Sequence, residues 1–352
     1  MNVGKTNPGR FFEDFELGET IRHPTPRTVH EGECALYTSL YGSRFALQSS
    51  SAFARVCGLP QAPVDDLLAF HVVFGKTVPD VSLNAVANLG YAQARFEALL
   101  YPGDTVSAKS EVIGLKENSN GKTGVVYVRS RGTNQRGETV LDYVRWVMVR
   151  KRTEGTPAPA AHVPDLKPAV APDELKLPAG LDLSVFDTGL SGSPHLWDDY
   201  TIGERIDHVD GMTLEEADHM QATRLYQNTA KVHFNQHTEA AGRFGRRLIY
   251  GGHIISLARA LSFNGLANAC LVAAINGGRH AAPSFAGDTI YAWSEVLDKA
   301  PLPGRSDAGA LRLRLVATKD LPCATFPYRD PEGSYLSAIV LDLDYWVIMP
   351  RR

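Results

Sequence analysis

Residues 251–263 read GGHIISLARALSF, an apolar stretch that two glycines open. Four of its apolar side chains recur at helical spacing and fall on one face: Ile254, Ile255, Ala258 and Leu261. Such a face predicts a buried helix. Two later segments alternate in the manner of strands, GDTIYAWSEVL at 287–297 and YLSAIVLDLDYWVIM at 335–349. A buried helix followed by strands of antiparallel character predicts an α+β fold in which a sheet wraps around the helix.

The chain repeats itself, because three blocks of its first half recur in the same order 184 to 200 residues later. The paired blocks are FEDFELGETIRHPTPRTVHEGECALYTSLY with WDDYTIGERIDHVDGMTLEEADHMQATRLY, YPGDTVSAKSEV with FAGDTIYAWSEV, and LDYVRWVMVRKR with LDLDYWVIMPRR. The segment between the halves holds seven of the 21 prolines and many alanines, which is typical of an extended linker. We therefore expect two copies of one domain, at 1–152 and 195–352, joined by a Pro/Ala-rich linker at 153–194.

Each half also carries a signal for a second helix. Thr28 with Glu31, and Thr213 with Glu216, fit the T-x-x-E capping box. In this motif the two side chains bond backbone amides at the start of a helix. The pattern predicts a helix from each of these points to the Leu-Tyr pair that follows it in each half.

Composition excludes several classes of function. The net charge of −3 over 352 residues gives no field that attracts nucleic acid or an anionic membrane, and the one notable basic run is GRFGRR at 242–247. No stretch approaches the roughly 18 apolar residues of a membrane span, and the first residues lack a signal-peptide core. The four cysteines show neither CxxC nor metal-ligand spacing, so we expect no disulfide and no metal. The expected location is the cytoplasm.

Two short motifs, NTAKVH at 228–233 and YGG at 250–252, resemble those of the MaoC-type enoyl-CoA hydratases. That family carries D-x-N-P-x-H and, at a fixed distance after its histidine, a His-Gly-Met at the start of a central helix. His233 and Tyr250 keep this distance, 17 residues, but Asn228 replaces the aspartate and Tyr250 replaces the second histidine. The resemblance implies a double hot-dog fold, in which two antiparallel sheets each wrap around a central helix.

The first half lacks the proton-transfer group of this motif. At the repeat offset of 185 residues, Ser43 stands opposite Asn228 and Gln48 stands opposite His233. We therefore expect the first half to be a degenerate copy and the second half to be the catalytic one.

Hydration of an enoyl thioester requires a held water, a proton carrier and donors for the enolate oxygen. His233 is the expected proton carrier, since imidazole titrates near neutral pH. The amides of Gly251 and Gly252, at the start of the central helix, are expected to donate to the enolate oxygen. Asn228 can hold the water by hydrogen bonds but cannot take a proton. Tyr250 is expected either to pack or to donate its hydroxyl to the ligand.

Longer stretches, among them NPGRFFEDF and LYQNTAKVHFN, resemble one branch of this family. They imply reversible hydration of mesaconyl-CoA to β-methylmalyl-CoA in the ethylmalonyl-CoA pathway. The carboxylate on the attacked β-carbon of that substrate requires a positive partner, for which Arg44, Lys231 and His237 are candidates. We hypothesise that an amide at position 228 serves to reduce the repulsion of this carboxylate, by about 1 to 4 kcal/mol at a separation of roughly 4 Å. Arg243, in the basic run, is a candidate for binding the phosphates of coenzyme A.

Alternatives stay open at this point. Another enoyl-CoA is a possible substrate, a hot-dog thioesterase would use the same scaffold but release free coenzyme A, and a non-catalytic acyl-CoA-binding protein would not need the missing aspartate. Coenzyme A is expected only as part of the substrate, with no metal or redox cofactor. A homo-oligomer, preferably a dimer, is expected. His71 and His253, near the starts of the two central helices, are expected to be core residues.

Overall fold

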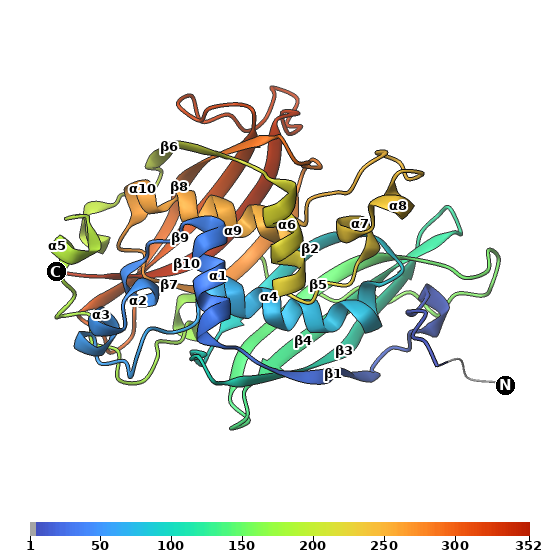
Figure 1. Ribbon diagram of the computed structural model, residues 1–352, viewed down its shortest axis with the longest axis horizontal. Coiled ribbons are helices and arrows are strands. Elements are labelled where there is room, and N and C mark those ends of the chain that lie inside the picture. Colours follow the sequence, from blue (N-terminus) through green and yellow to red (C-terminus); the bar gives the residue numbers. More distant parts are fainter. Residues whose placement is uncertain (1–4) are drawn as a thin grey trace.

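The computed structural model describes residues 5–352, which form one curved sheet of ten strands with helices on its inner side (Figure 1). Neighbouring strands are antiparallel, and their order is β1-β3-β4-β5-β2-β7-β10-β9-β8-β6. The strands are β1 (Thr20–Thr28), β2 (Ala85–Phe96), β3 (Thr105–Glu117), β4 (Thr123–Thr133), β5 (Thr139–Arg150), β6 (Arg205–Thr213), β7 (Leu271–His280), β8 (Thr289–Pro301), β9 (Ala308–Lys319) and β10 (Ile339–Pro350). Each half of the chain supplies five adjacent strands, and β2 and β7 join the two sets at the centre.

Two central helices, α4 (Asp66–Thr77) and α9 (Gly251–Leu261), lie in front of the sheet in Figure 1, one before each half. Every residue of α4 is buried, and so is every residue of α9 except Gly251. The helix and the two strands predicted in the second half are confirmed by α9, β8 and β10. The alternation of the last strand is confirmed as well, since its apolar side chains belong to the main core: Leu341, Leu343, Tyr345 and Val347. The result is the predicted double hot-dog fold.

Another helix precedes each central helix, α1 (Glu31–Tyr41) in the first half and α6 (Glu216–Leu225) in the second. The predicted extents are confirmed, but the predicted threonine caps are wrong. Thr28 Oγ1 bonds Thr105 Oγ1 at 2.8 Å, because Thr28 is still part of β1 and faces the neighbouring strand. Thr213 is likewise the last residue of β6 and bonds the neighbouring Thr289 at 2.9 Å.

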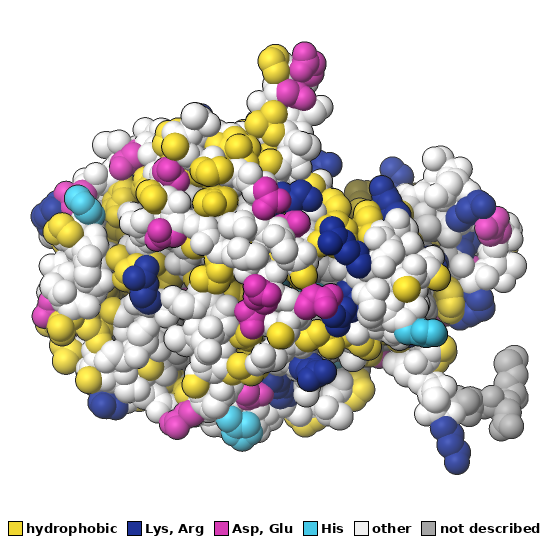
Figure 2. Space-filling view, turned by 45° about the horizontal axis from the view of Figure 1, so that its top comes forward, with side chains coloured by type: hydrophobic (Ala, Val, Ile, Leu, Met, Phe, Trp, Pro, Cys, Tyr) yellow, Lys and Arg dark blue, Asp and Glu magenta, His cyan; other side chains and the backbone are white. Residues whose placement is uncertain are grey.

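The remaining helical segments are short. They are η1 (Phe12–Asp14), α2 (Ala46–Ser49), α3 (Ser51–Val56), η2 (Val78–Ser82), η3 (Pro172–Glu174), α5 (Thr188–Ser191), η4 (Trp197–Asp199), α7 (Lys231–Phe234), α8 (Gln236–Glu239) and α10 (Phe263–Leu266). None of the helices in residues 5–352 is long and apolar enough to cross a membrane. Figure 2 shows acidic and basic side chains interspersed over one face of the molecule.

An approximate two-fold axis relates the halves and passes between the central helices. The hydroxyls of Tyr41 and Tyr226, which lie 185 residues apart, bond each other at 2.7 Å. His71 Nε2 and Ser256 Oγ, again 185 residues apart, lie at 2.9 Å. A residue can contact its own equivalent only close to a two-fold axis. The repeat seen in the sequence is therefore a spatial pairing of two similar units.

The segment between the halves has little regular structure but is packed against the sheet. It contributes buried Val170, Leu175, Leu181 and Leu183 to a cluster with residues of β7 and β10. The indole nitrogen of Trp346 donates to the carbonyl oxygen of Val170 at 3.0 Å. The boundaries of the domains at 152 and 195 stay a prediction.

Candidate active site

The start of α9 presents backbone amides that have no partner among the residues the structure describes. Tyr250 precedes the helix with an extended backbone (φ −63°, ψ 127°) and provides no side-chain cap. Its own amide donates to His219 Nε2 at 2.8 Å, which fixes the position of the peptide before the helix. Within residues 5–352, no acceptor bonds the amide of Gly251 or Gly252. Open amides at the positive end of a helix dipole form a site for a negatively charged oxygen.

Only glycine fits at these two positions. A Cβ at Gly251 would lie 2.6 Å from His280 Nδ1, and one at Gly252 would lie 2.5 Å from His71 Cε1. Real Cβ atoms do not approach other heavy atoms so closely. The glycines thus allow the helix start to contact two histidine rings.

His233 lies beside this helix start, on α7. Its Nδ1 donates to the carbonyl oxygen of Leu248 at 2.9 Å. Because a carbonyl can only accept, the proton sits on Nδ1, and Nε2 keeps its lone pair. The ring centroid lies 5.4 Å from that of Tyr250. Burial lowers the pKa of His233 to about 4, against the raising effect of the bond to Leu248. The imidazole is therefore neutral at pH 7 and can accept a proton through Nε2.

Further neutral histidines surround Tyr250. The Tyr250 hydroxyl lies 3.3 Å from Nδ1 of His71, which reaches across from the first half, and Tyr41 Oη lies 2.8 Å from His253 Nδ1. Burial is the largest cause that lowers the pKa of His71 to about 3 and the pKa of His253 and of His280 to about 4. The expectation that His71 and His253 are buried is confirmed.

Asn228 lies next to an open cavity between the halves. Its Oδ1 accepts from the amide of Ala230 at 3.0 Å, which sets the turn before α7. The cavity measures about 740 Å³, and its lining includes Asn228, Phe234 and Lys76. No hydrogen bond joins Asn228 to His233 in the described part of the chain. The side-chain amide of Asn228 keeps its Nδ2 donors for other partners.

The structure does not gather all the predicted residues at this place. Arg44 is exposed and stacks on Phe263 at 4.5 Å, beyond the C-terminal end of α9. An 11-residue helix spans about 16 Å, so Arg44 lies at the opposite end from the open amides. Lys231 and Arg243 are exposed, the latter against the ring of Phe244 at 5.0 Å.

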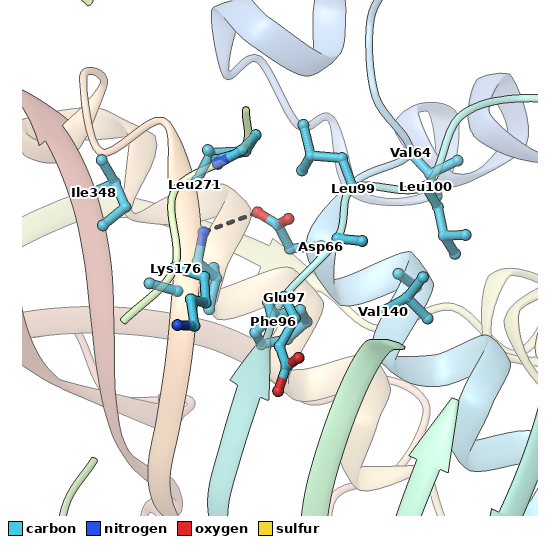
Figure 3. A pocket seen from close by; sticks show the side chains of 15 residues that line it. Val64, Asp66, Phe96, Glu97, Leu99, Leu100, Val140, Lys176, Leu271 and Ile348 are labelled. Carbon is cyan, nitrogen blue, oxygen red and sulfur yellow. Dashed lines mark hydrogen bonds between the residues drawn. The ribbon is translucent and has the colours of Figure 1, made fainter. Parts of the chain in front are cut away.

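The equivalent helix start in the first half is occupied by the protein itself. Asp65 Oδ1 accepts from the amide of Leu67 at 2.9 Å. Asp66 Oδ2 accepts from the amide of Val272 at 2.8 Å, the dashed line in Figure 3. Burial, with a smaller contribution from the charge of Asp65, raises the pKa of Asp66 to about 8.

In the first half the side chain equivalent to His233 makes a structural hydrogen bond. Gln48, at the position of His233, donates Nε2 to the carbonyl oxygen of Cys270 at 2.9 Å. An amide cannot transfer a proton in the way that imidazole can. This helix start therefore differs from that of α9 both in its side chain and in its occupied amide.

Sequence reasoning missed His219 and His280. They lie on α6 and at the end of β7, far in sequence from the motif, and only the tertiary fold brings them to Tyr250 and Gly251. Neither position carries a motif signal. In residues 5–352 no three His, Cys, Asp or Glu side chains are grouped so that they could hold a metal ion.

The fold and this arrangement define a class of protein: a double hot-dog protein with a MaoC-like histidine beside an open helix start. A crystal structure of a MaoC domain dehydratase from Chloroflexus aurantiacus superimposes with a TM-score of 0.97, at 67% identity and with 99% of both chains covered. A conserved Mycobacterium tuberculosis protein with a double hotdog fold gives a TM-score of 0.73 at 25% identity, with 97% of this chain and 98% of that chain covered.

Sequence comparison specifies the family. The family described as mesaconyl-CoA hydratase matches residues 2–322. The chain is 67% identical over 348 residues to the β-methylmalyl-CoA dehydratase of Chloroflexus aurantiacus, with 99% of both chains covered. It is 63% identical over 352 residues to the mesaconyl-CoA hydratase of Cereibacter sphaeroides, with 99% of this chain and 100% of that one covered. The chain belongs to the mesaconyl-CoA hydratase family.

Proposed function

We propose that this chain catalyses the reversible hydration of mesaconyl-CoA to β-methylmalyl-CoA, with His233 as the proton carrier. The names of its relatives support this substrate. The observation that carries the proposal is the pairing of a neutral His233, whose Nε2 lone pair is available, with the open amides at the start of α9.

The hydration step follows from these groups. His233 Nε2 takes a proton from water while the water oxygen bonds to the β-carbon of the enoyl thioester. The electrons of the double bond move to the thioester oxygen, and the amides of Gly251 and Gly252 stabilise the resulting enolate. The imidazolium then returns its proton to the α-carbon. One water is added, His233 ends neutral, and the reverse sequence gives dehydration.

Asn228 and Tyr250 are proposed to bind rather than to transfer protons. Asn228 Oδ1 is engaged by Ala230, so its Nδ2 is the group left to hold the water or the substrate. Burial raises the pKa of Tyr250 well above its usual range, so its hydroxyl stays protonated and can donate. The missing aspartate of the wider family therefore leaves His233 as the acid-base group.

Coenzyme A is proposed to lie in the cavity between the halves. The cavity beside Asn228 supports this route, because it is open and lies at the segment that carries His233. Lys231 and Arg243 are exposed cations on the same segment and are proposed to meet the phosphates. Arg44 is not proposed to bind the substrate, because it stacks on Phe263 at the end of α9 opposite to the open amides.

The wider setting is also a proposal. We propose a cytoplasmic homodimer that acts in the ethylmalonyl-CoA pathway without a metal or redox cofactor. The repeat and the family membership support a self-contained hydratase.

The test is an assay of purified protein with mesaconyl-CoA. We expect a product heavier by one water, together with loss of enoyl absorbance, and no free thiol. Release of free coenzyme A would instead identify a thioesterase, and binding without any product would identify an acyl-CoA-binding protein. Faster turnover of crotonyl-CoA than of mesaconyl-CoA would assign a different enoyl-CoA as substrate.

A further inference from the structure

A buried arginine without an ionic partner lies close to the candidate site. Arg145, on β5, is fully buried, and its guanidinium lies 4.3 Å from the ring centre of Phe74. Its Nη2 donates to Thr77 Oγ1 at 2.7 Å and to Ser82 Oγ at 3.3 Å. Nε and Nη1 have no partner among residues 5–352, carboxylates included. A buried charge left in this way is costly, which points to an anion supplied from outside the protein.

Aromatic side chains connect Arg145 to the start of α9 by two routes. Tyr91, its register partner on β2, places its hydroxyl 3.4 Å from His280 Nε2, and His280 lies against Gly251. Phe74, which stacks on Arg145, lies 5.7 Å from the ring of Tyr250. One aromatic side chain thus separates Arg145 from the helix start on each route, Tyr91 on the first and Phe74 on the second.

The two-fold axis offers an internal comparison. Phe74 on α4 corresponds to Arg259 on α9 at the offset of 185. Arg259 is buried, stacks on Phe45 at 3.6 Å and donates to Ser262 Oγ at 3.1 Å. It also lowers the pKa of both Asp65 and Asp66, though burial dominates and raises them, so protein carboxylates lie near it.

The equivalents of those carboxylates are missing near Arg145. At the same offset, Tyr250 and Gly251 stand where the first half has Asp65 and Asp66. One buried arginine therefore has acidic groups of the protein nearby, and the other lies behind Phe74 and Tyr91, near a helix start that lacks such groups. A carboxylate that a substrate brings to this helix start would restore the missing charge.

We propose that Arg145 binds the carboxylate on the β-carbon of the substrate and thereby selects dicarboxylic over monocarboxylic acyl-CoA thioesters. The proposal rests on the proposed function, because it takes mesaconyl-CoA as the substrate. Guanidinium donors to a carboxylate in a desolvated site are among the strongest hydrogen bonds in proteins, and the remaining donors of Arg145 suit this role. Arg145 is then a specificity-determining residue that has no part in proton transfer.

The experiment compares two saturated thioesters that cannot react, succinyl-CoA with a carboxylate and butyryl-CoA with a methyl group. Calorimetry gives the dissociation constants for the wild type, for Arg145→Met and Arg145→Lys, and for the matched control Arg259→Met. We expect the wild type to prefer succinyl-CoA, and Arg145→Met to lower that preference by about 10- to 100-fold, as for a lost charged hydrogen bond. Arg145→Lys should retain part of the preference, and Arg259→Met all of it.

Folding is checked by circular dichroism, and Arg145→Gln, which can still bond Thr77, replaces Arg145→Met if the latter unfolds. A folded Arg145 variant that keeps the wild-type preference would overturn the proposal. Hydration of mesaconyl-CoA by the wild type is assayed separately. Hydration with an unchanged preference in the variant refutes the role of Arg145 alone. A preference that depends on Arg145 without any hydration refutes the proposed function alone.

Discussion

The starts of the two central helices occupy equivalent places in one fold and are used differently. At α4 the amide of Leu67 is bonded by Asp65, and Gln48 is tied to the backbone at Cys270. At α9 the amides of Gly251 and Gly252 have no acceptor in the described chain. The comparison shows that the hot-dog scaffold does not itself make a site. The site depends on whether the positive end of the helix is satisfied by the protein or left for a ligand.

The difference also separates stability from function. A side-chain cap such as Asp65 contributes about 0.5 to 2 kcal/mol to a helix. The start of α9 forgoes this stabilisation, and its glycines add conformational entropy to the unfolded chain. We interpret α4 as the copy that supports the fold and α9 as the copy that retains the chemistry.

The largest expected effect on kcat distinguishes His233, beside the start of α9, from Gln48, its equivalent in the first half. His233→Gln removes the lone pair that accepts the proton, so kcat for mesaconyl-CoA should fall by about 10² to 10⁴. Gln48→Ala, at the equivalent position, should leave kcat near the wild-type value, although it removes the bond to Cys270. Initial rates of the two folded variants provide the measurement. Similar losses of kcat in both variants would contradict the claim that only the second half carries the proton-transfer group.

The next effect tests the open amides. Gly251→Ala places a Cβ against His280 and shifts the helix start, so kcat should fall by about 10² to 10³, as for one lost donor to the enolate. The melting temperature should fall too, because the same Cβ disturbs packing. Gly277→Ala is the control, since its Cβ would meet only Tyr91 O at 3.9 Å. A destabilised Gly251→Ala with full specific activity in its folded fraction would show that the glycine is only structural.

A smaller effect concerns charge at the entrance to α7. Asn228→Asp can keep the bond to the Ala230 amide, because the acceptor oxygen is retained. The new charge repels a substrate carboxylate, so the kcat/KM ratio of mesaconyl-CoA to crotonyl-CoA should fall about tenfold, which corresponds to about 1.4 kcal/mol. Steady-state kinetics on both thioesters provides the ratio. Equal losses on both substrates would mean that the amide is needed to orient the water.

The smallest effect on turnover is expected at the start of α4. Burial raises the pKa of the Asp66 carboxyl from an ordinary 3.8 to about 8. Between these two pH values the carboxyl is protonated in the folded state and ionised in the unfolded state. Asp66 therefore destabilises the fold progressively as the pH rises from 4 to 8. Asp66→Asn removes this dependence while kcat stays near wild type. The melting temperature of the variant should rise relative to that of the wild type as the pH rises. A difference in melting temperature that stays constant with pH would contradict the shifted pKa.

The sequence predicted the parts of this comparison that depend on local pattern. The apolar face of 254–261 and the alternation of 341–347 gave α9 and β10, because burial on one face imposes a period that a single segment reveals. The threonine caps were predicted wrongly, since a capping box cannot show that Thr28 still belongs to a strand paired with β3. Local spacing carries no information on the neighbour that a side chain meets across a sheet.

The site was predictable only where a motif marked it. His233, Tyr250 and the two glycines follow from the resemblance to the MaoC-type motifs, and the structure places the ring of His233 beside that of Tyr250. His219, His280 and Arg145 come from distant segments, and their closeness to α9 depends on the packing of both halves. Arg44 was selected for its nearness to the first-half motif, but the fold places that segment at the far end of α9.

The Tyr41–Tyr226 pair at the two-fold axis has a consequence for how such a protein can change over time. In a symmetric dimer of identical chains, every substitution appears in both sites at once. Here the two units share one polypeptide, so each can be altered alone. One unit carries Asp65 and Asp66 where the other carries Tyr250 and Gly251, and His71 from the first unit reaches Tyr250 of the second. Tandem fusion thus permits a division of labour in which one unit supplies a side chain to the candidate site of the other.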